Sequence, residues 1–291
     1  MRTSPLHLGD DGTPWHEAME AAGVSPKAKE RFRECAEDAY IARHDKTGEL
    51  KLFGHYCGSR FCRLCVAKRA ARVRAALLPW LKGRTYRFMT LTLKHRNDEP
   101  LRVMVDRLYE RFHHLRRLSL WKKHVVGGAS FLEVKRTSKG WHPHLHILIE
   151  GSYFPQSWLS ELWLGVTRDS KVVDIRKASD ERTAKYVAKY ACKGFSEENP
   201  LTHDQRVELV HALHGRRLVI AFGTWNKKFS VTKLLEESLD EEVPLDDETK
   251  WTRVCSLGTL IGQAKGGDET SIRMLVALDL GRLIGLKEAP T

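Results

Sequence analysis

Three histidines at every second position form the most informative pattern in the sequence: His142, His144 and His146. They lie in an apolar stretch bounded by Gly140 and Gly151, which predicts a buried strand. Because side chains alternate between the two faces of a strand, the three imidazoles project from one face together. Neutral imidazoles are common ligands of divalent metal ions. The pattern predicts a metal site, and the plainer alternative is three solvated histidines at a strand end.

A carboxylate for such a site is available in the preceding stretch. Residues 129–134 have the composition of a neighbouring strand, joined to the histidine strand by a polar turn at residues 137–140. In this hairpin, Glu133 can face His144 or His146 and complete a site of two histidines and one carboxylate with open positions. His142 would support the site from the next position on the same face.

Four cysteines predict a second, structural metal site. Three of them lie within nine residues, and a predicted β-hairpin at residues 39–54 returns the fourth to them. Zinc prefers four tetrahedral thiolate or imidazole ligands, and Cys-x-x-Cys supplies two of them from one turn. The expected zinc ligands are Cys35, Cys57, Cys62 and Cys65. His44 and His55 are alternatives to Cys35 as the fourth ligand, and four unrelated buried cysteines are the plainer interpretation.

A helix predicted at residues 181–193 carries two stripes of different chemistry. Small apolar residues recur with helical spacing on one side, at Ala184, Val187, Ala188 and Ala191. The opposite side presents two phenols and two ammonium groups, from Tyr186, Lys189, Tyr190 and Lys193. A phenol needs its anion stabilised to act as a nucleophile, and nearby ammonium groups supply that positive charge. The alternative is a solvated lysine face with two half-buried tyrosines. A glycine that follows, Gly194, is expected to end the helix.

Helices and strands must alternate along the chain to position these residues. Further strands are predicted at residues 86–93, 172–176 and 216–222, and further helices at residues 66–80, 100–121, 155–165 and 202–213. An acidic stretch at residues 236–248 is predicted to be a linker, and residues 251–291 a small helical tail. We therefore expect an N-terminal arm with the zinc-binding module at 1–83, a central domain at 84–228, and the linker with a helical C-terminal segment at 229–291.

Charge indicates a polyanionic partner. The chain of 291 residues has a net charge of +12 and a pI near 9.5. Residues 60–125 hold 18 Lys and Arg against 4 Asp and Glu, whereas residues 230–250 hold 8 acids against 2 bases. No apolar run has the length of a membrane span, and the N-terminus lacks a signal-peptide core. We expect a cytoplasmic protein with reduced thiols. The absence of a Gly-x4-Gly-Lys-Ser/Thr loop argues against an ATP-driven helicase.

Taken in order, these motifs resemble the HUH endonucleases, and within them the rolling-circle replication initiators of small plasmids. The resemblance rests on Phe-Met-Thr-Leu-Thr at 88–92, His-Pro-His-Leu-His at 142–146, the Tyr/Lys helix, the cysteine pattern and Leu-His-Gly-Arg-Arg-Leu at 213–218. It covers about residues 32–225. Two tyrosines four positions apart depart from the single tyrosine common in plasmid initiators. They resemble instead phage initiators and two-tyrosine transposases.

The resemblance implies an α+β fold with an antiparallel sheet of about five strands, in which the two-histidine strand is central and the tyrosine helix lies against it. It implies that His144, His146 and Glu133 bind Mg²⁺ or Mn²⁺ and that residues 84–228 form the HUH endonuclease domain. Tyr186 or Tyr190 would attack a DNA phosphate, stay linked to the 5′ end and free a 3′-OH primer.

The partners implied are single-stranded or origin hairpin DNA and a host helicase and polymerase, with no membrane. Two other functions stay open at this point. One is a two-tyrosine transposase of single-stranded DNA, and the other is a zinc-containing DNA-binding protein without catalysis.

Overall fold

The computed structural model describes residues 12–81, 86–94, 99–178, 187, 192, 194–195, 200–228, 237–242 and 250–285. The chain divides into two compact units, one of Met1–Ala71 with Glu237–Thr291 and the other of Arg72–Glu236. Among the helices in the described ranges, none has the length and apolar character needed to cross a membrane.

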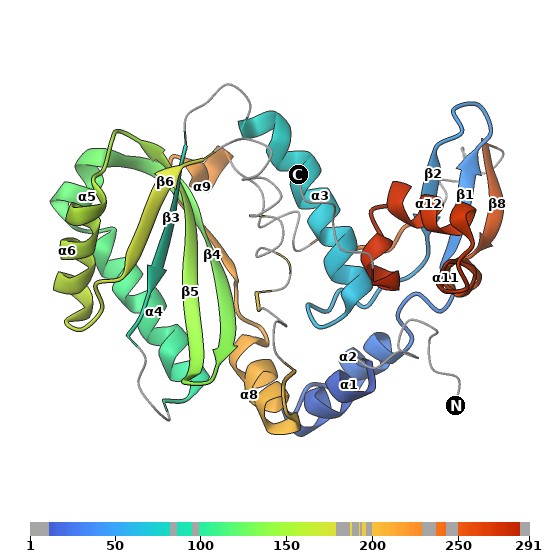
Figure 1. The fold of residues 1–291 in the computed structure, drawn as a ribbon, viewed down its shortest axis with the longest axis horizontal. Helices are drawn as coiled ribbons and strands as arrows, with labels where there is room; N and C mark the ends of the chain where they lie inside the picture. The colour runs from blue at the N-terminus through green and yellow to red at the C-terminus, as the bar shows by residue number, and fades with distance from the viewer. Residues whose placement is uncertain are drawn as a thin grey trace. The chain divides into compact units, whose positions relative to one another are not determined.

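The second unit contains a five-stranded antiparallel sheet flanked by helices, which confirms the predicted α+β class. The strand order is β6-β3-β5-β4-β7, so the histidine strand β5 is central (Figure 1). Its strands are β3 (Arg87–Thr92), β4 (Val125–Thr137), β5 (Gly140–Gly151), β6 (Val173–Lys177) and β7 (Val219–Gly223). Its helices in the described ranges include α4 (Leu101–Leu115), α5 (Ser119–His124), α6 (Gln156–Thr167), α8 (His203–Leu213) and α9 (Trp225–Lys228).

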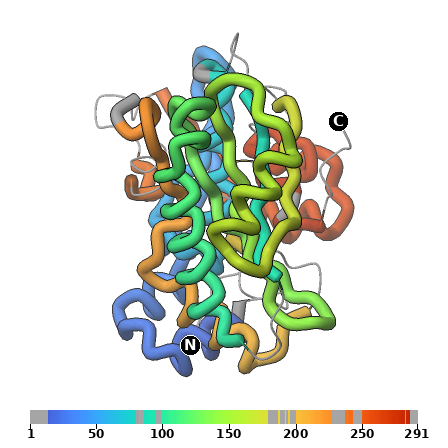
Figure 2. Tube along the Cα trace, turned by 90° about the vertical axis from the view of Figure 1, so that its left-hand side faces the viewer, coloured from blue at the N-terminus to red at the C-terminus, as the bar shows by residue number. Residues whose placement is uncertain are grey.

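One face of this sheet is buried under helices because its side chains are almost all apolar. On β5 this face carries Trp141, Leu145, Ile147 and Ile149, all buried. Helices α4 and α6, green and yellow-green in Figure 2, lie side by side over it. The indole Nε1 of Trp163 on α6 donates to the carbonyl oxygen of Thr92 at 2.7 Å, which fixes α6 to the end of β3. The histidines must therefore lie on the other face.

Strand pairing sets which residues meet on that other face. Glu133 of β4 lies directly opposite His144 of β5, and Thr90 of β3 lies opposite His146. A two-residue turn joins β4 to β5, and Gly140 after it has a φ of +111°, which glycine tolerates far better than other residues. The predicted hairpin is correct, and both of its strands are longer than the sequence indicated.

The helix predicted at 100–121 is two helices in the structure. Helix α4 ends at Leu115, and α5 begins at Ser119 after a turn that redirects the chain into β4. The apolar spacing continues through this turn because Leu115 and Trp121 both face the same core. Periodicity alone therefore did not reveal the break.

The first unit contains a three-stranded antiparallel sheet in the order β2-β1-β8. Strands β1 (Tyr40–His44) and β2 (Leu50–Phe53) form the predicted hairpin, and β8 (Trp251–Ser256) pairs with the free side of β1. The remaining elements of this part of the chain are α1 (Gly12–Ala21), α2 (Pro26–Arg33), α3 (Arg63–Leu81, which continues into the second unit), α11 (Leu257–Lys265), α12 (Glu269–Ala277) and η2 (Gly281–Ile284).

The C-terminal segment is helical from Leu257 onward, as predicted, but it begins with a strand where a helical tail was expected. The ring of Trp251 on β8 packs edge-on against Phe53 and His44, with ring centroids 5.3 and 4.9 Å apart. The guanidinium of Arg253 lies 4.7 Å from the ring of Tyr40. These cross-strand contacts stabilise β8. No local pattern in residues 251–256 predicts them.

Pro143 lies where the sheet opens beside the histidines. Strand β3 ends at Thr92, opposite His144, so β5 has no β3 partner at Pro143. On its other side, Val134 is opposite Pro143 but donates its N–H to the carbonyl oxygen of Gly194. Proline has no N–H to leave unpaired at such a position. Pro143 therefore lies at a point where β5 has strand β4 on one side and no strand on the β3 side.

Glu208 of α8 connects three elements of the second unit, and its loss should destabilise them. It accepts a hydrogen bond from the Leu101 backbone N–H at the start of α4 and another from the Trp141 indole. We expect Glu208→Ala to lower the free energy of unfolding by about 2 kcal/mol, because both donors lose a charged acceptor. Urea unfolding followed by tryptophan fluorescence measures this. The control is His211→Ala, at an exposed position of the same helix; an equal loss there would contradict the assignment.

Candidate metal centres

Glu133, His144 and His146 form a compact cluster on the open face of the sheet. The Nε2 of His146 lies 2.8 Å from a carboxylate oxygen of Glu133, and the Nδ1 of His144 lies 3.7 Å from the same oxygen. One ligand atom from each of the three residues lies within 4.8 Å of the others. The structure therefore brings together the three residues that the sequence suggested for this site.

His142 lies at the edge of the cluster. Its Nδ1 is 3.0 Å from the Nε2 of His144, so one ring nitrogen of each is occupied by the other. This contact leaves the Nδ1 of His144 directed toward Glu133. His142 thus lies beside His144, and its supporting role stays a prediction.

Burial and charge set the protonation states in this cluster. Burial favours the neutral form of Glu133, but its interactions with His144 and His146 and the charge of Lys135 outweigh burial and lower its pKa to about 2. Burial is the main cause that lowers the pKa of His146 below its ordinary value. Near neutral pH, Glu133 is thus an anion and His146 is neutral, the forms in which both bind metal ions.

A divalent metal ion fits this donor set. Glu133 is only 1% exposed, and its second carboxylate oxygen is buried without a hydrogen-bond partner in the described part of the chain. A buried carboxylate oxygen without a hydrogen bond is costly. The Nζ of Lys135 lies 3.9 Å from it and forms an ion pair, but this distance is too long for a hydrogen bond. The side chain of His144 is 12% exposed, so solvent or a substrate can reach the cluster from its side.

Thr90 is the supporting residue that the sequence did not single out. Its Oγ1 lies 3.2 Å from the Nδ1 of His146, opposite the nitrogen that faces Glu133. Such a contact fixes the orientation and tautomer of a metal-binding imidazole. The ring of Phe88 stacks on His146 with centroids 5.5 Å apart and further restricts it. Strand alternation places Phe88 and Thr90 on the histidine face, and this alternation is the feature of the sequence that could have identified them.

The proposed nucleophiles and their lysines, Tyr186, Lys189, Tyr190 and Lys193, lie outside the described residues. Their nearest described neighbours are informative. Val187 is helical and buried, as its position in the apolar stripe predicts. Gly194 has a φ of +75°, the left-handed conformation expected of a residue that ends a helix. Its carbonyl oxygen accepts the N–H of Val134, and Phe195 forms a parallel bridge with Val134, the residue next to Glu133.

Four cysteines form a second cluster, in the first unit. The Sγ of Cys35 lies 3.6 Å from that of Cys62 and 3.5 Å from that of Cys65, and the Sγ of Cys57 lies 3.5 Å from that of Cys65. These distances are too long for disulfides. A tetrahedral Zn²⁺ with Zn–S bonds of about 2.3 Å places its sulfurs about 3.8 Å apart. The cluster is therefore compatible with zinc.

Charge repulsion supports a cation in this cluster. Hydrogen bonds with the sulfurs of Cys35, Cys62 and Cys65 raise the pKa of the Cys57 thiol, and burial and then the charge of Cys62 raise it further. Backbone N–H groups of Cys57 and Ser59 point at the sulfurs of Cys35 and Cys57 at 3.4 Å. A bound cation removes the remaining repulsion.

Neither histidine considered as a fourth ligand joins the cysteines. The Nδ1 of His55 lies 2.6 Å from a carboxylate oxygen of Asp38. The Nδ1 of His44 accepts the N–H groups of Lys46 and Thr47 in the hairpin turn. Cys35 therefore completes the set, as the hairpin predicted.

The fold and the two clusters define an α+β protein with two donor sets compatible with metal ions, one of oxygen and nitrogen atoms on a central sheet and one of four sulfurs. A family model described as "Replication protein" matches residues 50–258, more than two thirds of the chain. The chain belongs to this replication protein family.

Three curated relatives, each named "Protein rep", are similar to the chain. The one from Bacillus amyloliquefaciens is 25% identical over 285 residues, which cover 88% of this chain and 81% of that protein. One from Bacillus sp is 28% identical and covers 60% of this chain and 62% of its own length. One from Streptococcus pneumoniae serotype 2 is 29% identical and covers 55% of each. No solved structure is significantly similar to the chain.

Removing the Thr90 hydroxyl should weaken metal binding at the sheet cluster without removing a ligand. We expect Thr90→Val to lower the affinity for Mn²⁺ about tenfold, because His146 loses the contact that orients it. Titration calorimetry with Mn²⁺ measures the change. Thr92→Val is the matched control, since the Thr92 hydroxyl on the same strand face donates to the Val172 carbonyl oxygen instead of a histidine. Equal affinity in Thr90→Val and the unmodified protein would show that Thr90 does not support the site.

Loss of one sulfur should empty the cysteine cluster. We expect Cys62→Ser to lower the zinc content of the purified protein from about one ion per chain towards zero and to destabilise the first unit, because three ligands no longer complete a structural site. Elemental analysis and thermal unfolding measure both effects. Cys255→Ser is the control, because Cys255 lies on β8 and outside the cluster. Full zinc content in Cys62→Ser would refute the four-cysteine site.

Proposed function

We propose that this protein initiates rolling-circle replication of a small plasmid by nicking and rejoining single-stranded DNA at the origin. One observation carries the proposal: a buried Glu133, His144 and His146 cluster on the central strand of an antiparallel sheet, in a chain that belongs to a replication protein family. The basic charge of residues 60–125 supports DNA as the partner.

The proposed nucleophile is a tyrosine of the segment that precedes Gly194, either Tyr186 or Tyr190. The chain connection supports this assignment, because Gly194 is hydrogen-bonded to Val134, next to Glu133. Tyr190 is four residues before Gly194 in the sequence, and four residues span at most about 14 Å. The phenol of Tyr190 is therefore within chain reach of the strand that carries the cluster. In a helix, Tyr186 would follow one turn away, about 6 Å along the axis.

In the proposed reaction, the phenolic oxygen attacks the phosphorus of one phosphodiester and the bond to the 3′ oxygen breaks. The phenol gives up its proton, and Lys189 and Lys193 stabilise the anion. The departing 3′ oxygen takes up a proton and becomes the primer end, while the 5′ phosphate stays on the tyrosine. Because the tyrosyl ester keeps the phosphodiester energy, a later 3′-OH can reverse the step and rejoin the strand.

Glu133, His144 and His146 would hold Mg²⁺ or Mn²⁺, which supplies positive charge for a non-bridging phosphate oxygen and offsets the charge of the transition state. His142 and Thr90 keep the imidazoles in place. The exposed side of His144 leaves room for the phosphate. The cysteine cluster would hold Zn²⁺ as a structural ion, and a host helicase and polymerase would extend the freed 3′ end.

The proposal predicts metal-dependent nicking that requires the cluster. With supercoiled plasmid carrying the cognate origin and Mn²⁺, we expect His144→Ala to lower the nicking rate at least about 100-fold while DNA affinity changes little. Gel assays of nicked product and fluorescence anisotropy measure the two quantities. His113→Ala, at an exposed position of α4, is the control. Equal loss of nicking and of DNA binding in His144→Ala would mean that the histidines are structural, and no nicking by the unmodified protein would refute the proposal.

The same reaction assigns the nucleophile. A labelled origin oligonucleotide should form a covalent adduct with the protein, and Tyr186→Phe, Tyr190→Phe and the double variant identify its attachment. Adduct in both single variants and none in the double variant supports two nucleophiles that alternate between initiation and termination. Loss in one single variant identifies one nucleophile. Adduct in the double variant would contradict the tyrosine assignment.

A further inference from the structure

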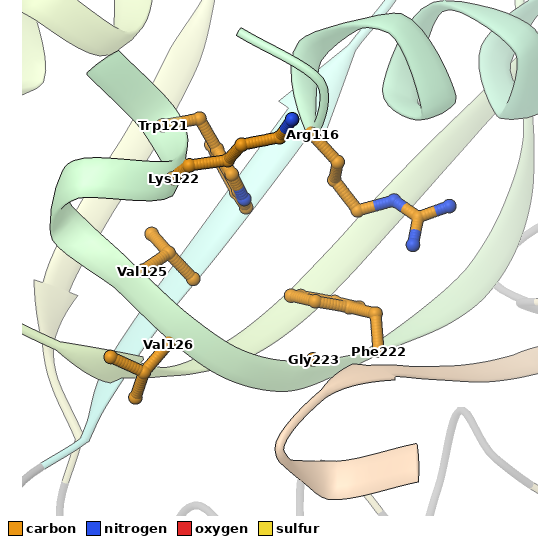
Figure 3. Close-up of a pocket in the computed structure, with 7 residues that line it drawn as sticks. All are labelled: Arg116, Trp121, Lys122, Val125, Val126, Phe222 and Gly223. Carbon is orange, nitrogen blue, oxygen red and sulfur yellow. The ribbon is translucent and has the colours of Figure 1, made fainter. Parts of the chain in front are cut away.

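A pocket lies in the second unit, at the end of the sheet remote from the histidines. Its volume is about 430 Å³, and it opens between the end of α4, helix α5, the start of β4 and the end of β7. Figure 3 shows the side chains around it: Arg116, Trp121, Lys122, Val125, Val126, Phe222 and Gly223. Gly223 is required there, because its φ is +61° and a Cβ would collide with the carbonyl oxygen of Val126. The pocket is therefore part of the fold.

Both charged groups of this pocket are cations. The segments that line it, residues 111–132 and 209–235, contain no Asp or Glu. Within the described part of the chain, neither Arg116 nor Lys122 forms an ion pair or a hydrogen bond with a carboxylate. Elsewhere in this unit arginines do have acidic partners: Arg107 contacts Glu99 at 2.9 Å, and Arg216 contacts Asp106 at 2.6 Å. Within the described residues, the two cations of this pocket thus differ from these arginines in forming no ion pair with a carboxylate.

Arg116 is held in place by aromatic rings. Its guanidinium lies 4.9 Å from the ring of Phe112 and 5.2 Å from the ring of Phe222, and Figure 3 shows it extending over Phe222. Its Nε is buried and has no hydrogen-bond partner among the residues that the structure describes, and burial lowers the pKa of the guanidinium. Stacked on two rings, the guanidinium has little freedom to turn to solvent, so an anion that enters the pocket meets a positioned partner.

We propose that this pocket binds a phosphate group of the DNA strand, at a site separate from the metal cluster. The inference rests on the proposed function for its ligand, DNA. A phosphodiester suits the pocket because its oxygens can accept from the guanidinium and from the Lys122 ammonium together.

Distance separates this site from the proposed chemistry. Val126 lies seven residues before Glu133 on β4, and at about 3.3 Å per residue the two are about 23 Å apart. A substitution in the pocket therefore leaves the metal cluster unchanged. The pocket would anchor the DNA strand. A substitution in the pocket should therefore lower the DNA affinity and leave the rate of the cleavage step unchanged.

Adjacent residues of the same type provide matched controls for a test. Arg116 and Lys122 line the pocket, whereas Arg117 and Lys123 are exposed and outside it. Each is replaced by Gln, so that every variant loses one charge and only the position differs. The probe is a labelled single-stranded oligonucleotide, and its affinity is measured by anisotropy between 50 and 200 mM salt, a range in which phosphate contacts dominate the response.

We expect Arg116→Gln and Lys122→Gln each to weaken binding and to reduce the slope of log affinity against log salt by up to about 0.7, the value for the one phosphate contact that the two cations share on a single strand. Arg117→Gln and Lys123→Gln should leave the slope unchanged. Equal changes in all four variants would mean that general charge alone attracts DNA, and no change in the first two would overturn the site. Thermal unfolding checks that Arg116→Gln is folded, since Arg116 also packs on two rings.

A second pair of variants tests the pocket without touching Arg116. Val126 at the rim is 52% exposed, and Val103 on α4 is 51% exposed. Val126→Glu should weaken binding, because it places a negative charge at the proposed phosphate position, and Val103→Glu should change it less. The nicking rate at saturating DNA should be unchanged in both variants, because it depends on the metal cluster. A protein that binds DNA through this pocket but does not nick would refute the proposed function alone, whereas nicking with unchanged affinity in every pocket variant would refute this site alone.

Discussion

A buried negative charge is the constraint on which the second unit depends. The Glu133 carboxylate is almost fully enclosed, and its interactions with His144 and His146 keep it ionised. Such a charge is tolerated only if the strands hold its partners in register, because a slip of one residue would turn Glu133 to the apolar face. The tight turn between β4 and β5 sets that register. The same turn thus determines both the sheet and the donor set.

Each of the two units contains one cluster of candidate metal ligands, and the two clusters differ in their donor atoms. Four sulfurs leave no position for a further ligand, so they can serve the fold of the first unit only. On the sheet, two imidazoles and one carboxylate leave coordination positions open, and the side chain of His144 reaches the surface. The helices α4 and α6 cover the opposite face, so neither of them lies over the histidines.

Local patterns in the sequence predicted much of this arrangement. Alternation along residues 142–149 gave the faces of β5, and the Cys-x-x-Cys spacing gave the sulfur cluster, because both depend on neighbours a few positions apart. Contacts between distant segments were not predictable in this way. The pairing of β8 with β1 leaves no local signal. Alternation along residues 88–92 gives the face of Thr90 but not its bond to His146. The turn at 116–118 could not be predicted because the apolar spacing continues through it. The two cations of the pocket, Arg116 and Lys122, lie on either side of this turn, so their proximity could not be predicted either.

The pairing of β8 with β1 also has a consequence for the order in which the chain can fold during synthesis. His44 of β1 is paired with Trp251, so translation must continue for about two hundred residues before the first sheet can close. At about 5–20 residues per second, this delay is roughly 10 to 40 s. The whole second unit emerges from the ribosome during this delay. Until β8 is made, one edge of β1 has no strand beside it, and the β1–β2 hairpin must stay intact without a third strand. A metal ion that joins the four sulfurs early would hold the hairpin together through that interval.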